Sequence, residues 1–109
     1  MSPEICRPLW EILVPTIHHD GRPIDAEFHK IWDAQVRAIS HGLTICPPAK
    51  GEWVTSTNVI SERMIPVRFM ATIEQAAEIA TMTLKYYDQE AVMYYRLGDF
   101  VRILKEDGD

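Results

Sequence analysis

An ionisable side chain, Glu62, stands at the start of a segment with the pattern of a strand. Apolar side chains alternate through the stretch from about Arg63 to Met70, so we expect a strand with one buried face there. Glu62 then lies at the mouth of this strand and close in sequence to the aromatic Trp53. A solvated strand end would also explain Glu62, so its position alone makes it only a candidate for chemistry.

Aromatic residues and one polar connection supply the other candidates. The aromatic positions are Trp53 after a turn, Tyr86-Tyr87 at a helix end and Tyr94-Tyr95 in a strand pattern. Ring faces attract flat bases and cations, but packing in a core or an interface explains such residues more simply. Gln89 lies in the polar segment 88–90, for which a connection between helix and sheet is the simple interpretation. Spacing alone decides neither case.

Other site chemistries find little support in the sequence. His18, His19, His29 and His41 are assigned structural or solvated roles, and we predict no metal site. The serines and cysteines lack a nucleophile elbow, and the glycines are too widely separated to cradle a phosphate. Kinase, nucleotidase and dehydrogenase activities therefore lose their main support.

Length and charge limit the class of protein. The 109 residues suit one domain with a single core, which we place at about residues 9–104. A net charge of −5 and scattered Lys and Arg argue against a nucleic-acid partner. No apolar run approaches a membrane helix, and Met1–Arg7 lack the layout of a secretion signal, so we expect a cytoplasmic protein without a membrane partner. Cys6 and Cys46 are then expected to be free thiols.

Local signals predict the elements of the first half of the chain. An apolar run at Leu9–Val14 is typical of a buried strand. Asp25 is the expected N-cap of a helix that ends at His41-Gly42, with the glycine as its terminator. The expected apolar stripe of this helix is Phe28, Ile31, Trp32, Val36 and Ile39. Leu43–Cys46 is the second strand, and Gly51–Val54 begins an extended return arm.

The second half begins with the strand at Arg63–Met70, in which Pro66 indicates an edge or a bulge. Thr72, with Gln75 three residues later, is a capping-box signature for a second helix. The expected stripe of that helix is Ile73, Ala76, Ala77, Ala80, Leu84 and Tyr87. Two further segments are predicted as strands, Ala91–Tyr95 and Phe100–Leu104, with a turn at Gly98-Asp99.

This order of elements predicts an α+β fold. Strand, helix, strand, strand, helix, strand gives the ferredoxin-like βαββαβ sandwich, with two helices on one face of an antiparallel sheet. The extra C-terminal strand would add to the sheet edge of a neighbouring copy. The uncovered sheet face needs a partner, and a second copy of the chain is the usual one at this size, so we expect a homo-oligomer.

Several short motifs together resemble the small phage S-adenosylmethionine lyases, a family of trimeric ferredoxin-like proteins. Gly51-Glu52-Trp53 is similar to the family's Gly-x-Tyr, with tryptophan in place of tyrosine. Glu62, followed after four residues by Val67-Arg68, is similar to its glutamate-x4-Val-Arg. The segment from Tyr87 to Val92 matches its aromatic-x-Gln-x-x-Val. The resemblance covers roughly Leu9 to Tyr95, and a family of small bacterial proteins of unknown function shares much of the pattern.

The resemblance implies a lyase acting on S-adenosylmethionine or on an adenosyl or adenylated relative. In that reaction the substrate's carboxylate attacks its own γ-carbon, so the enzyme needs no cofactor, metal or protein nucleophile. The resemblance implies Glu62 as the catalytic residue. The substrate-binding residues that it implies are Trp53, Arg68, Tyr87 and Gln89. It also implies a homotrimer with its pockets between subunits.

Two other interpretations remain open. One is a non-catalytic small-ligand-binding or oligomeric assembly module with the same fold. The other is a protein inhibitor made by a phage or mobile element, which fits the size and acidity of the chain.

Overall fold

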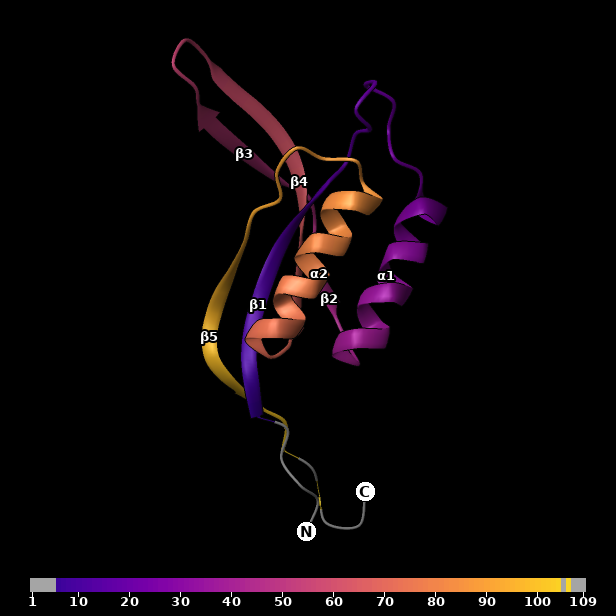
Figure 1. The fold of residues 1–109 in the computed structure, drawn as a ribbon, viewed down its shortest axis with the longest axis vertical. Coiled ribbons are helices and arrows are strands. Elements are labelled where there is room, and N and C mark those ends of the chain that lie inside the picture. The colour runs from indigo at the N-terminus through magenta and orange to yellow at the C-terminus, as the bar shows by residue number, and fades with distance from the viewer. Residues whose placement is uncertain (1–5, 105, 107–109) are drawn as a thin grey trace.

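The chain folds as two helices packed on one face of an antiparallel sheet (Figure 1). The computed structural model describes residues 6–104 and 106. The strands are β1 (Cys6–Pro15), β2 (Thr44–Ile45), β3 (Ala49–Val54), β4 (Val59–Met70) and β5 (Tyr94–Arg102). The helices are α1 (Ala26–Ser40) and α2 (Ile73–Tyr86). The strand order is β2-β4-β1-β5, and β3 pairs with β4 as well. The predicted α+β class is confirmed.

β1 lies inside the sheet and carries much of the core. Alternate residues of a strand face opposite sides, and Trp10, Ile12 and Val14 all point toward the helices and are buried. Their neighbours on β4 include Val67 and Phe69, which are buried as well. The strands predicted for these two segments are confirmed, and both extend further than the sequence indicated.

Both helices begin at the predicted caps. The side chain of Asp25 accepts a hydrogen bond from the backbone N–H of Phe28 at 2.8 Å. Thr72 and Gln75 form a complete capping box, in which each side chain accepts the backbone N–H of the other residue. In the described part of the chain, neither helix is long and apolar enough to cross a membrane.

The end of α1 differs from the prediction, because His41 and not Gly42 adopts the left-handed conformation. The φ angle of His41 is 67°, and its N–H donates to the carbonyl of Arg37 at 2.8 Å. The Ser40 hydroxyl donates to the carbonyl of Gly42 at 2.7 Å. The helix is therefore closed by hydrogen bonds around a histidine, one residue before the glycine.

The buried faces of the helices differ in part from the predicted stripes. Trp32 and Val36 on α1 and Ala76 and Ala80 on α2 are buried, as expected. Exposed instead are Ile31, Ile73 and Ala77. Buried residues absent from the prediction are Ser40 on α1 and Ile79 and Thr83 on α2. Thr83 accepts a hydrogen bond from the indole N–H of Trp32 at 3.0 Å, so the two helices are joined by a polar contact inside the core.

Pro66 lies inside β4, at a point where the neighbouring strand is interrupted. β2 ends at Ile45 and β3 begins at Ala49, so no continuous partner runs along this edge of β4. Proline has no N–H to donate, but the carbonyl of Pro66 accepts the N–H of Cys46 at 2.9 Å. The break between β2 and β3 explains how a proline is accommodated here.

The two C-terminal strands of the prediction form one strand, β5, and the predicted turn at Gly98-Asp99 is wrong. Residues 91–93 lie outside the strand. The register with β1 shifts on both sides of Leu9, which pairs with Gly98, and Leu97 is the extra residue of a bulge. The sequence Gly-Asp is common in turns, but here β5 continues through it and pairs with β1, and the irregularity becomes a β-bulge.

Candidate functional site

The hairpin of β3 and β4 extends beyond the ends of the helices (Figure 1). Trp53 pairs with Ile60, and Gly51 pairs with Glu62, so these four positions share one face of the hairpin. The indole lies against the glycine, because a Cβ atom at Gly51 would stand 3.5 Å from Cζ2 of Trp53. The fold therefore places an aromatic ring next to the strand position of Glu62.

A hollow of about 860 Å³ opens beside this part of the hairpin. Three predicted site residues line it, namely Trp53, Glu62 and Gln89. Its apolar walls include Ile60, Met64, Met93 and Tyr94. The volume lies within the roughly 300–1,000 Å³ of ordinary ligand pockets. Residues from β3, β4 and the segment after α2 thus converge on a space large enough for a small molecule.

A smaller hollow of about 310 Å³ adjoins the first. The residues that line both are His19, Glu62, Met64 and Gln89. Sequence reasoning gave the His18-His19 loop no place in the site. The register shows why it belongs there, since Pro15 at the end of β1 pairs with Met64 and the following loop passes beside Glu62.

Glu62 and Gln89 are both available to a ligand. Glu62 is exposed, and its side chain makes no hydrogen bond or ion pair with any described residue. The side-chain Nε2 of Gln89 donates to the carbonyl of Tyr87 at 3.1 Å, and its backbone N–H donates to Leu84 at 3.0 Å. These bonds hold the side chain in place and leave its Oε1 able to accept a hydrogen bond from a ligand in the hollow.

Tyr87 is not part of this hollow. It is only 2% exposed and lies in the core between the helices. Its hydroxyl is 2.6 Å from Nδ1 of His29, and burial raises the pKa of the phenol. Because Tyr87 is buried, it does not reach a ligand in the hollow of its own chain. The sequence motif places an aromatic residue at a helix end but does not show whether that residue is buried.

Arg68 also lies away from the hollow. Its Nε donates to Oε1 of Glu11 at 2.9 Å, on the sheet face opposite the helices. That hydrogen bond is the main cause that raises the pKa of the Arg68 guanidinium. Arg68 lies six positions after Glu62 along one strand, a span of about 20 Å. The structure therefore does not bring these two predicted site residues together in a single chain.

Metal-binding groups do not gather in the described part of the chain. No group of three or more His, Cys, Asp and Glu side chains is close enough there to hold an ion. Cys46 is a free thiol as predicted, whereas the expectation for the Cys6 side chain falls outside the described residues.

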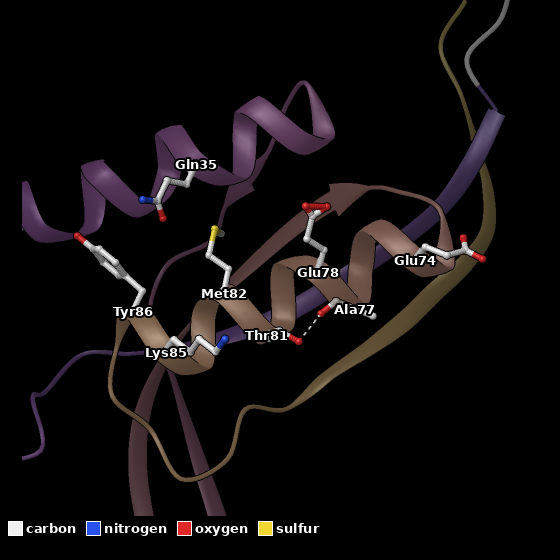
Figure 2. Close-up of a pocket in the computed structure, with 8 residues that line it drawn as sticks. All are labelled: Gln35, Glu74, Ala77, Glu78, Thr81, Met82, Lys85 and Tyr86. Atoms are coloured by element: carbon white, nitrogen blue, oxygen red, sulfur yellow. Dashed lines mark hydrogen bonds between the residues drawn. The ribbon is translucent and has the colours of Figure 1, made fainter.

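A further hollow of about 780 Å³ lies on the outer surface of the helices. Figure 2 shows Met82 and Tyr86 of α2 reaching toward α1, where Gln35 forms the opposite wall. The hollow also has charged residues of both signs on its wall, namely Glu74, Glu78 and Lys85. None of the site residues that the motif resemblance implies lines this hollow, so the candidate site remains the hollow beside the hairpin.

Comparison with known proteins identifies the fold. No family model matches the sequence, and no curated protein is similar to it. CutA from Synechococcus elongatus matches with a TM-score of 0.60 at 16% identity, over 92% of this chain and 86% of that one. CutA1 from Oryza sativa matches with a TM-score of 0.64 at 8% identity, over 97% and 87% of the two chains.

A phage S-adenosylmethionine lyase in complex with S-methyl-5′-thioadenosine has the same fold. Its TM-score is 0.60 at 13% identity, over 93% of this chain and 92% of that one. Such low identities show the fold alone. The chain therefore has the ferredoxin-like fold found in CutA proteins and in this lyase, and the likeness favours neither activity by itself.

Proposed function

We propose that this protein is a lyase acting on S-adenosylmethionine or an adenosyl relative, and that the hollow beside the hairpin holds the substrate. One observation carries the proposal. Trp53, Glu62 and Gln89 lie on separate strands and loops, and all three line the same hollow. The fold shared with a lyase bound to S-methyl-5′-thioadenosine supports the same reading.

The proposed reaction is an intramolecular displacement. A carboxylate oxygen of the substrate forms a bond to its own γ-carbon while the bond from that carbon to sulfur breaks. The bonding pair leaves with sulfur, and the products are methylthioadenosine and homoserine lactone. A carboxylate and a sulfonium are neutralised together, so a pocket with apolar walls favours the less charged transition state.

The three residues have distinct proposed roles. The face of Trp53 attracts the sulfonium by a cation–π interaction. The carboxylate of Glu62 orients the cation or the ribose hydroxyls, and Oε1 of Gln89 accepts a hydrogen bond from the adenosine part. The protein thus acts by holding the substrate in its attack conformation.

The proposal includes a homotrimer with the substrate between subunits, as the motif resemblance implies. Arg68 and Tyr87 do not reach the hollow of their own chain. Under this proposal Arg68 contacts substrate only if a neighbouring copy brings its sheet face to the site. Tyr87 is given a structural role through His29 instead.

Release of methylthioadenosine from S-adenosylmethionine tests the proposal. We expect release above the spontaneous rate for the wild-type chain and its loss in Glu62→Gln. Glu52→Gln is the matched control, since Glu52 lies on β3 opposite Ser61 and lines neither hollow. No release at enzyme concentrations near that of the substrate, with the adenylated relatives also inert, would overturn the proposal. Activity retained in Glu62→Gln would remove Glu62 from the mechanism.

A second candidate function is a non-catalytic ligand-binding or assembly module. The fold is compatible with it, since the CutA proteins among the structural neighbours share this fold and one of them is described as a periplasmic divalent cation tolerance protein. Saturable binding of S-adenosylmethionine without product formation would support this alternative over the lyase.

A further inference from the structure

A separate hollow of about 270 Å³ lies between α1 and the flank of the sheet formed by β2 and β4. Its walls are mainly apolar, with Val14, Trp32, Ile45, Ile65 and Val67 among them. It shares no lining residue with the two hollows beside the hairpin. This space is below the roughly 300–1,000 Å³ of pockets for drug-sized ligands, so only a small ligand fits.

One acidic residue, Asp33, lines this hollow. Its carboxylate makes no hydrogen bond or ion pair with any described residue. Burial raises the pKa of Asp33, and the nearby His29 and Arg37 only partly oppose this. A half-buried carboxylate without a partner is stabilised by any cation that reaches it.

The other polar groups on the wall do not supply that cation. Lys30 lines the hollow, but its Nζ is 3.3 Å from a carboxylate oxygen of Glu27. His29 is held by the hydroxyl of Tyr87, and burial lowers its pKa, although Asp33 and Asp25 oppose the shift. Its imidazole is therefore neutral at neutral pH. Asp33 therefore remains without a hydrogen bond or close ion pair to a described residue, although the charge of Arg37 acts on it from the next turn of α1.

We propose that this hollow is a binding site for a small organic ammonium ion with an apolar body. The ammonium group pairs with Asp33 and donates hydrogen bonds to its carboxylate. The apolar body packs against Trp32 and against the valine and isoleucine side chains of the sheet. A small anion of the same shape is rejected, because it would meet the Asp33 carboxylate.

Binding of 2-phenylethylamine, followed by methyl and amide resonances in NMR, tests the site. We expect saturable shifts at Ile45, Ile65 and Val67 at millimolar concentration, and no such shifts with 3-phenylpropionate. Asp33→Asn should weaken amine binding by about tenfold, the loss expected for a hydrogen bond to a charged group. Ala26→Leu, which adds bulk at the exposed first residue of α1 that lines the hollow, should abolish it.

Glu78→Gln removes the same charge from an exposed position on α2 and should leave amine binding unchanged. Equal binding of the anion, or full binding by Asp33→Asn, would overturn the charge assignment. Unchanged binding by Ala26→Leu, or shifts confined to residues beside Trp53, would overturn the site itself.

Discussion

Glu11 is a buried carboxylate, 7% exposed, on the sheet face opposite the helices. Arg68 donates to one of its oxygens from β4, and the hydroxyl of Tyr95 donates to the other from β5. Desolvation raises the pKa of Glu11, but the hydrogen bonds from Tyr95 and Arg68 and the charge of Arg68 outweigh it, so the pKa lies below its ordinary value. The hydrogen bond to Glu11 also raises the pKa of Tyr95 to about 12.

Glu11→Gln should therefore lower stability in a pH-dependent way. At neutral pH we expect a loss of about 1–3 kcal/mol in the free energy of unfolding, the usual cost of disrupting a buried hydrogen-bonded charge. Because the folded-state pKa is depressed, the contribution is present above pH 4.5 and is lost as the pH falls through the folded value. Urea unfolding at a series of acid pH values should show wild type and variant converging.

The control for this prediction is Glu78→Gln, an exposed change on α2. It should differ little from wild type at any pH. A gap between Glu11→Gln and wild type that stays constant from neutral to acid pH would contradict a depressed pKa for Glu11.

At the residue scale, the sequence predicted part of the candidate site. Trp53 and Glu62 belong to one hairpin, so the local strand register brings them together. Gln89, which its motif singles out, lines the same hollow. Arg68 and Tyr87 carry equally good motif matches, yet each has a tertiary partner distant in sequence. Motif spacing contains no information about such partners, and burial decides whether a residue can meet a ligand.

At the element scale, caps were predictable because their signals lie within a few residues. The end of α1 shows the limit of that rule. A non-glycine residue at positive φ is strained, and His41 occupies this position while Gly42 next to it does not. The bulge in β5 was hidden for a different reason, since it depends on pairing with β1 more than eighty residues away in the chain.

His41→Gly should accordingly stabilise the protein. Relief of the left-handed strain exceeds the added chain entropy of glycine, and we expect a gain of about 0.5–1 kcal/mol in the free energy of unfolding. Thermal unfolding measures the gain. Gly42→Ala is the matched control, because Gly42 has open space around its Cβ position and no positive φ, and it should not lower stability. A less stable His41→Gly would mean that the imidazole itself contributes to the cap.

At the scale of the whole molecule, the chain is more extended than a compact domain of its length. The Cα radius of gyration is 15.8 Å, against about 13 Å for a compact chain of this length. Both helices lie on one face of the sheet, which leaves the other face uncovered by helices (Figure 1). Exposed apolar side chains along β5 and the hairpin tip include Leu97, Phe100, Val54 and Val59. These features favour self-association.

If the proposed trimer forms, light scattering should give its mass at micromolar concentration, against 12.5 kDa for one chain. β5 lies at the edge of the described sheet, so Phe100→Glu places a charge where a neighbouring copy would pack. We expect this variant to dissociate, while Thr81→Glu on the exposed face of α2 keeps the wild-type mass. A wild-type mass of one chain would refute the shared pocket.

The same variant connects assembly with catalysis. If the site is completed by a neighbouring copy, a dissociated Phe100→Glu chain with unchanged circular dichroism should lose methylthioadenosine release, although Phe100 does not line the hollow. Activity should return at protein concentrations high enough to restore the trimer, which an unfolded variant would not show. Full activity in a dissociated chain would instead mean that Trp53, Glu62 and Gln89 form a complete site within one copy.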